Sequence, residues 1–360
     1  MRAAVSKSGG SPWRCAGAVW LLLFSAIACA GGNSRVSVDA ELTALLAPVA
    51  PELRPAAARI AGMPRPAFTT EALPSRRAAL RQFEQPPLPD IPFEKRTIPG
   101  PAGAPDVTVY LINIGGGQRP AILHTHGGGY IAGSPAQDLP RLQRLAQALD
   151  CVIVSVDYRL APETTWQGSV EDNYAALKWL HDHAAELGVD RQRLAVMGES
   201  AGGGHAALLA LMARDRGQVP LIFQMLIYPM LDDRTASTRE VPAPLGELIW
   251  TAEANRFGWR AFLGQEPGTT AVPAAAVPAR AGSLAGLPPA FIAVGGLDLF
   301  VQENIAYAQR LIAAGVPTEL LVLPGAFHAF DVVAEETALA RRFSEARVRA
   351  LREAFAQRPE

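Results

Sequence analysis

A serine stands between glycines in the segment VMGESAGGGHA (196–206), where Gly198, Ser200 and Gly202 form a G-x-S-x-G pattern. An apolar strand is expected before this pattern and a helix after it, so the serine would lie on a tight strand-to-helix turn. The glycines leave room for such a turn, and the helix start brings free backbone N–H groups beside the hydroxyl. The pattern therefore predicts a nucleophilic serine.

A serine hydroxyl needs a base to accept its proton, and the base needs an acid to orient it. Of the six histidines, His328 stands in a loop just after an expected strand, late in the chain. Asp298 stands just after the strand expected at 290–296, and the interval to His328 is enough for one helix and one strand. We therefore predict Ser200 as nucleophile, His328 as base and Asp298 as acid.

The acid has alternatives. Glu303 and Asp331 are the alternative acids, although neither stands at the end of an expected strand. Asp298 itself could instead cap the helix expected at 302–314, because aspartate is a preferred residue at helix N-termini.

A second glycine-rich stretch, HTHGGGYIAGS (124–134), continues from the strand expected at 120–126. His124 and His126 have no carboxylate or third histidine beside them, so a metal site is not predicted. A phosphate cradle would need a downstream lysine or ribose-binding acid, and neither appears, so a phosphate site is not predicted. Glycines instead let backbone N–H groups approach an oxygen that becomes negative during a reaction. We predict a backbone site, with His126 bracing the loop and His124 structural.

Strands and helices alternate through most of the chain, which predicts an α/β fold with a mostly parallel sheet covered on both faces. The expected strands are 107–114, 120–126, 151–156, 193–198, 221–228, 290–296 and 318–324, and the expected helices are 170–187, 201–214, 302–314 and about 335–355. The blocks 39–97 and 231–287 are too long for ordinary loops. We expect them to form cap elements over one edge of the sheet.

In this order the motifs resemble those of the hormone-sensitive-lipase-like esterases of the α/β-hydrolase fold, the bacterial family IV type. The resemblance extends over roughly 39–356 and rests on HGGGY (126–130), DYRLAPE (157–163), GESAGG (198–203), DLFVQE (298–303) and GAFHAF (325–330). It implies a single α/β-hydrolase domain, 39–358, with the triad predicted above. It also implies that the backbone N–H groups of Gly127, Gly128 and Ala201 form the oxyanion hole.

The resemblance further implies a serine carboxylic-ester hydrolase that acts on small to medium acyl esters through an acyl-enzyme, without a metal ion or organic cofactor. Three departures from the family pattern leave the substrate preference open. The strand-to-helix turn that carries the nucleophile, the elbow, most often reads G-D-S-A-G in the family, whereas this chain has Glu199. Gly204 replaces the Asn that usually follows the elbow. The family motif D-P-L-R-D-E, which aligns with DLFVQE (298–303), keeps its first and last residues only. Glu199 is expected to hydrogen-bond near the floor of the site, with a solvated surface acid as the alternative.

Aromatic residues are expected close to the substrate. The second cap block contains Trp250, Phe257 and Trp259, and Tyr130 follows the glycines of the HGGG box. These four side chains are candidates for the substrate pocket, and a packed core within the cap is an equal alternative.

Other functions remain open at this level. An amide hydrolase, or a carbohydrate or xenobiotic deacetylase, would use the same triad, since fold alone does not decide the substrate. The HGGG box favours esters. A receptor built on this fold would be expected to lack the base, but His328 is present.

The net charge of −1 gives no basic excess, so nucleic acid is not the expected partner. The expected partner is a small-molecule ester, and a homodimer is compatible with the sequence.

The first 30 residues resemble a signal peptide, followed by a linker at 31–38. Basic residues precede an apolar run at 16–30, which is short for a membrane span of about 20 residues. The run ends in an A-x-A cleavage signal, but AIAC (26–29) also resembles a lipoprotein box that would attach a lipidated Cys29 to a membrane. Either type of processing predicts an exported protein, in the periplasm or cell envelope or secreted. An uncleaved anchor or a misassigned start is the alternative.

Cys151 would have no partner for a disulfide and is expected to be buried.

Overall fold

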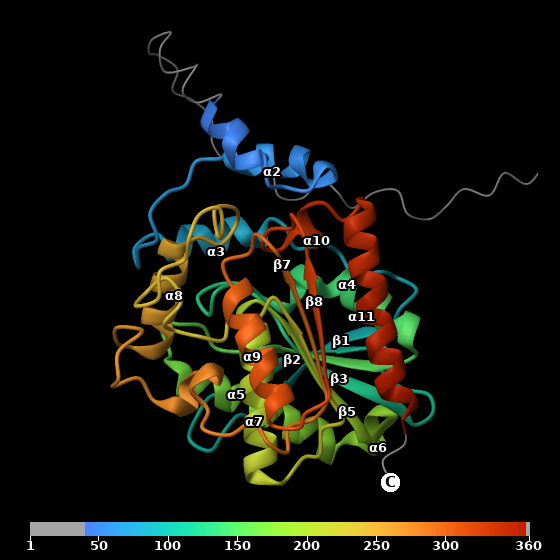
Figure 1. Ribbon diagram of the computed structural model, residues 1–360. Coiled ribbons are helices and arrows are strands. Elements are labelled where there is room, and N and C mark those ends of the chain that lie inside the picture. Colours follow the sequence, from blue (N-terminus) through green and yellow to red (C-terminus); the bar gives the residue numbers. More distant parts are fainter. Residues whose placement is uncertain (1–39, 358–360) are drawn as a thin grey trace, which may run out of the picture.

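The computed structural model describes residues 40–357, so the predicted signal peptide, the linker and Cys29 lie outside the described residues. Within them, eight strands form one sheet in the order β1-β2-β4-β3-β5-β6-β7-β8 (Figure 1). The strands are β1 (Phe93–Ile98), β2 (Val107–Ile112), β3 (Arg119–Thr125), β4 (Val152–Asp157), β5 (Val189–Glu199), β6 (Phe223–Ile227), β7 (Ala290–Gly295) and β8 (Thr318–Leu323). β2 is antiparallel to both of its neighbours, and the other pairs are parallel. The predicted α/β fold with a mostly parallel sheet is confirmed.

The central strands are buried on both faces. Every residue of β6 and β7 is buried, which is why their sequences, FQMLI and AFIAVG, are almost continuously apolar. Successive side chains point to opposite faces, so Phe291 belongs to one hydrophobic core and Ile292 to the other. The edge strand β8 instead consists of half-buried and exposed positions up to its last residue, Leu323, which is buried.

Helices cover the two faces of the sheet (Figure 1). α4 (Pro135–Leu149) and α11 (Ala338–Ala356) bury their apolar residues in one core, and α5 (Trp166–Asp182) and α7 (Ala201–Arg216) bury theirs in the other. α9 (Val301–Ala313) contributes Val301 to the first core and Tyr307, Ala308 and Leu311 to the second. The short helices α6 (Ala184–Leu187) and α10 (Phe330–Val333) complete the layers. Among the described residues, no helix is both long and apolar enough to cross a membrane.

The two expected cap blocks meet above one end of the sheet (Figure 1). The first contains η1 (Pro51–Leu53), α2 (Arg54–Ala61) and α3 (Leu73–Arg81), and the second contains α8 (Ala252–Leu263) with the 3-10 turns η2 (Ala274–Ala276) and η3 (Pro278–Arg280). Phe68, between α2 and α3, contacts the rings of Trp250 and Phe257. Its backbone N–H donates to the Glu253 carboxylate at 3.3 Å. The caps are therefore packed on each other as well as on the sheet.

The structure differs from the sequence-based prediction in three places. The end of the first cap block was wrong, because residues 93–97 belong to β1; its charged sequence FEKRTI suits an edge strand but lacks a strong apolar pattern. Helix α4 was not predicted, and it contains Pro140 in its interior, a residue that ordinarily interrupts helices. The helix expected at 170–187 is divided into α5 and α6 at His183.

Candidate active site

Ser200 stands on a strained turn between β5 and α7. Its φ of 57° and ψ of −121° are outside the regions that most side chains adopt. The two flanking glycines are required by close contacts: a Cβ atom on Gly198 would lie 2.3 Å from the carbonyl carbon of Gly202, and one on Gly202 would lie 1.9 Å from the Thr125 oxygen. The elbow predicted from the G-x-S-x-G pattern therefore has the expected form.

The structure brings Ser200, His328 and Asp298 together. His328 Nε2 lies 3.0 Å from Ser200 Oγ, and His328 Nδ1 lies 2.8 Å from Asp298 Oδ2. All three side chains are buried, and the other Asp298 oxygen accepts the N–H of Phe300 at 2.9 Å. Ser200 follows β5, Asp298 follows β7 and His328 follows β8. The three residues meet because the carboxyl ends of parallel strands lie at the same edge of the sheet.

The two alternative acids lie elsewhere. Glu303 accepts hydrogen bonds from the N–H groups of Leu231 and Asp232 and from the Thr235 hydroxyl. Burial raises the pKa of Glu303 well above its ordinary value. Asp331 accepts hydrogen bonds from Tyr228, Arg141 and Arg347. The carboxylate that faces His328 is Asp298.

The predicted oxyanion residues lie on two segments beside Ser200. A Cβ atom on Gly127 would be 3.5 Å from Ser200 Cβ, so the glycine backbone passes directly beside the serine. Gly128 has a φ of 127°, and a Cβ atom there would lie 2.0 Å from the Ala132 oxygen. Ala201 is the first residue of α7. The absence of a side chain at 127 thus lets the backbone pass close to the serine, and the glycine at 128 lets the loop pack against Ala132.

The two histidines of the HTHGGG stretch differ in their contacts. His126 Nδ1 lies 2.8 Å from the Gly127 oxygen, and its ring stacks on Tyr158 with 4.2 Å between ring centroids. The Tyr158 hydroxyl donates to the His126 backbone oxygen at 2.7 Å. Burial lowers the pKa of His126 to about 4, so its ring is neutral near pH 7. This geometry agrees with a bracing role. His124 is buried between β4 and the elbow.

Comparison with known proteins identifies the family. A family model described as the alpha/beta hydrolase fold matches residues 122–332, more than half of the chain. The chain belongs to the α/β-hydrolase family, in its hormone-sensitive-lipase-like esterase branch. It is a serine hydrolase of the carboxylesterase type.

Relatives from one organism and a solved structure illustrate the similarity. The chain is 37% identical to Esterase LipI of Mycobacterium tuberculosis over 68% of this chain and 77% of LipI. It is 39% identical to Carboxylesterase NlhH of the same species over 71% of this chain and 81% of NlhH. The structure of a bacterial heroin esterase is similar with a TM-score of 0.78 and 36% identity, covering 86% of this chain and 99% of that one.

Glu199, one of the departures of this hydrolase from the common family pattern, is buried beneath the elbow. Its Oε2 lies 2.8 Å from His124 Nε2, and its Oε1 accepts from Arg347 at 2.9 Å. Burial would raise the pKa of Glu199, but His124 and Arg347 lower it to about 2, so the group is a carboxylate. The expected place near the floor of the site is confirmed, and the solvated alternative is wrong.

The four candidate pocket residues of the hydrolase divide into two pairs. Tyr130 and Trp259 are almost completely buried and pack with Phe262, in a core that the cap shares with the sheet and not in a core of the cap alone. Trp250 packs on the loop of the HGGG box: a Cβ atom on Gly129 would lie 2.0 Å from its ring. Phe257 is half-buried.

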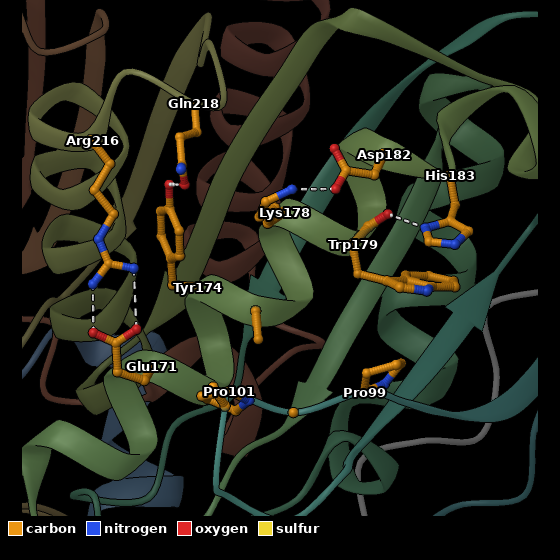
Figure 2. A pocket seen from close by; sticks show the side chains of 13 residues that line it. Pro99, Pro101, Glu171, Tyr174, Lys178, Trp179, Asp182, His183, Arg216 and Gln218 are labelled. Atoms are coloured by element: carbon orange, nitrogen blue, oxygen red, sulfur yellow. Dashed lines mark hydrogen bonds and ion pairs between the residues drawn. The ribbon is translucent and has the colours of Figure 1, made fainter.

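A surface hollow of about 380 Å³ lies apart from this site (Figure 2). It is lined by the loop 99–102, by α5 and by Arg216, and it contains none of the predicted site residues. Arg216 is the last residue of α7, about 22 Å along the helix axis from Ala201. Figure 2 shows its charges already paired, Arg216 with Glu171 and Lys178 with Asp182.

Sequence reasoning missed one group of polar residues around the site: Arg141, Tyr228 and Arg347. Arg347 carried a usable signal, because it stands in the apolar stripe of α11, four residues after the buried Phe343. An arginine at such a position indicates a buried carboxylate partner. The identity of that partner could not be read from the pattern.

Proposed function

We propose that this enzyme hydrolyses carboxylic esters with small to medium acyl groups through a Ser-His-Asp triad and an acyl-enzyme intermediate. The observation that carries the proposal is the pair of distances at His328, 3.0 Å to Ser200 Oγ and 2.8 Å to Asp298 Oδ2. The names of the similar proteins, esterase and carboxylesterase, support the ester class. The preference for shorter acyl groups rests on the family resemblance.

The reaction begins when His328 Nε2 accepts the Ser200 proton and Oγ attacks the ester carbonyl carbon. Asp298 accepts a hydrogen bond from His328 Nδ1, which keeps Nε2 free to act as the base and stabilises the imidazolium that forms. The C–O bond to the alcohol then breaks, and His328 returns the proton to the leaving oxygen. Water, activated by the same base, releases the acid from Ser200.

Negative charge on the carbonyl oxygen requires donors that are in place before the reaction. The backbone N–H groups of Gly127, Gly128 and Ala201 supply them in this proposal. Ala201 directly follows Ser200 in the chain, and the close fit of Gly127 to the serine supports the assignment. Loss of one such donor ordinarily lowers kcat by about 10²- to 10³-fold.

A chain-length series of p-nitrophenyl esters tests the proposal. We expect the highest kcat/KM between acetate and hexanoate, a decline towards laurate, and loss of the activity in Ser200→Ala. A matched anilide, p-nitroacetanilide, distinguishes the amidase alternative. Faster cleavage of the anilide than of p-nitrophenyl acetate would contradict the ester class, and a maximum at laurate would contradict the acyl-length preference.

A further inference from the structure

One arginine side chain connects the nucleophile segment with the base segment. Arg347, on α11, donates from Nη2 to Glu199 Oε1 at 2.9 Å and lies 3.5 Å from Asp331 Oδ2 through Nη1. Glu199 directly precedes Ser200, and Asp331 stands three residues after His328. The three bridging side chains are buried, so water screens their attraction only weakly.

The Glu199 end of this bridge is anchored in the sheet. Glu199 Oε2 lies 2.8 Å from His124 Nε2, and His124 Nδ1 lies 2.8 Å from the Ser155 hydroxyl of β4. Both carboxylate oxygens of Glu199 are therefore engaged, one by the sheet and one by α11. An aspartate would be about 1.5 Å shorter and could not meet both partners from the same backbone.

The Asp331 end is anchored close to the base. Asp331 Oδ1 accepts the Tyr228 hydroxyl at 2.9 Å, and Oδ2 also accepts from Arg141 of α4 at 3.2 Å. The Tyr228 ring in turn meets the His328 ring edge-on, with 4.8 Å between centroids. The bridge thus extends from the residue before the nucleophile to a ring that contacts the base.

We propose that Arg347 is a positioning residue for the reaction: it holds the Ser200 elbow and the His328 loop in register by joining Glu199 to Asp331. The inference rests on the proposed function, because it assigns Arg347 to the same Ser200–His328 pair. Its physical reason is that reactive groups must be held within a few tenths of an ångström, and a displacement of about 1 Å costs on the order of 10²-fold in rate. Buried ion pairs are well suited to fix one arrangement, even where they contribute little net stability.

Arg347→Met and Arg347→Lys, compared with a matched control, test the proposal. Arg280 is the control, because it pairs with the buried Asp233 at 2.6 and 2.9 Å in the second cap block. With a p-nitrophenyl ester, we expect Arg347→Met to lower kcat by about 10- to 100-fold with KM nearly unchanged. Arg347→Lys should recover part of kcat, since lysine keeps the charge but not the two-sided contact. Arg280→Met should lower the melting temperature and leave kcat as in the wild type.

A second readout separates this proposal from the ester assignment. Diisopropyl fluorophosphate reacts with an activated serine by forming an O–P bond at Oγ and releasing fluoride and a proton, and intact mass follows the rate. We expect Arg347→Met to slow this labelling by a similar factor. If wild type is labelled but cleaves no ester, the proposed substrate class fails while the role of Arg347 is still measured.

Glu199→Gln covers the case in which Arg347→Met does not fold. It keeps the size of the side chain and removes the charge that Arg347 faces, and circular dichroism verifies its fold. We expect slower labelling in this variant also. Wild-type labelling rates and kcat in a folded Arg347→Met or Glu199→Gln, or an equal fall of kcat in Arg280→Met, would overturn the proposal.

Discussion

The hydroxyl of Tyr130 occupies the space that a side chain at position 204 would need. A Cβ atom on Gly204 would lie 2.1 Å from Tyr130 Oη and 2.4 Å from the Met230 oxygen. The hydroxyl donates to that oxygen at 3.1 Å, and the Met230 N–H donates to the Ser200 oxygen at 2.9 Å. The HGGG loop is therefore tied to the nucleophile turn, and the glycine in place of the usual Asn makes the connection possible.

Gly204→Ala is expected to displace Tyr130 and to destabilise the protein by about 1–3 kcal/mol, as overpacking of a dense core does. Because Tyr130 ends the HGGGY motif, kcat should fall as well. Tyr130→Phe in the same background should restore part of the stability, because it removes the nearer of the two clashing oxygens. Urea unfolding of both single variants and the double variant measures this coupling, and strictly additive free energies would contradict it.

Asp298→Asn is expected to lower kcat by about 10⁴-fold with the fold intact, because an amide can hold His328 in the wrong tautomer. Glu303→Gln is the matched control among the alternative acids. Its amide oxygen can still accept from the N–H groups of Leu231 and Asp232, so kcat should change only a few-fold. A larger loss of kcat in Glu303→Gln than in Asp298→Asn would show that the acid was wrongly assigned.

Gly128→Ala should lower kcat by about 10²- to 10³-fold, the typical effect of losing one oxyanion donor, because the new Cβ atom cannot be accommodated beside Ala132. Gly103→Ala is the control for backbone strain alone: it has a φ of 77° but no atom within 4 Å of the new Cβ. Steady-state kinetics of the two variants should differ accordingly. Equal kcat values would remove Gly128 from the predicted donor set.

The stability of the protein should fall below about pH 6.5 because of His205. This side chain is fully buried, has no hydrogen-bond partner among the described residues, and has a pKa that burial lowers to about 3. Between the unfolded value of about 6.5 and this folded value, the unfolded chain binds a proton that the folded chain does not. The free energy of unfolding then decreases by up to about 1.4 kcal/mol for each pH unit of acidification.

His205→Leu should flatten this acid limb, and urea unfolding of both proteins at pH 7 and pH 5 measures it. The expected difference between wild type and variant over that interval is about 2 kcal/mol. His126, whose pKa is also lowered by burial, will leave a residual slope in the variant. Identical slopes in the two proteins would contradict the assignment to His205.

We expect the protein to be exported and to lose its first 28 to 30 residues on the basis of the cleavage motifs at 26–30. Intact mass and membrane fractionation of the natural protein distinguish cleavage after Ala30 from lipidation of Cys29. A lipidated Cys29 would give an added acyl mass and a membrane fraction, both lost in Cys29→Ser, whereas cleavage after Ala30 would leave a form without that mass. Recovery of the complete chain from the cytoplasm would contradict both.

The parts of the site that follow local rules were predictable. Ser200 was recognisable because a tight strand-to-helix turn requires glycines at fixed spacing, and Asp298 and His328 because each follows a strand in chain order. The apolar central strands β6 and β7 were equally clear. β1 and α4 were missed, because a charged edge strand and a helix with an internal proline both lack the expected local pattern.

The reactive side chains and the kind of fold that presents them could be predicted from the sequence, because they depend on turn geometry and hydrophobic periodicity over a few residues. The folded chain excluded Glu303 and Asp331 as the acid and revealed which side chains surround the elbow. Arg347 and Glu199 are 148 positions apart, and Tyr130 and Met230 are 100 apart. Such pairs form only after the sheet has brought distant segments together, so no short-range pattern encodes them.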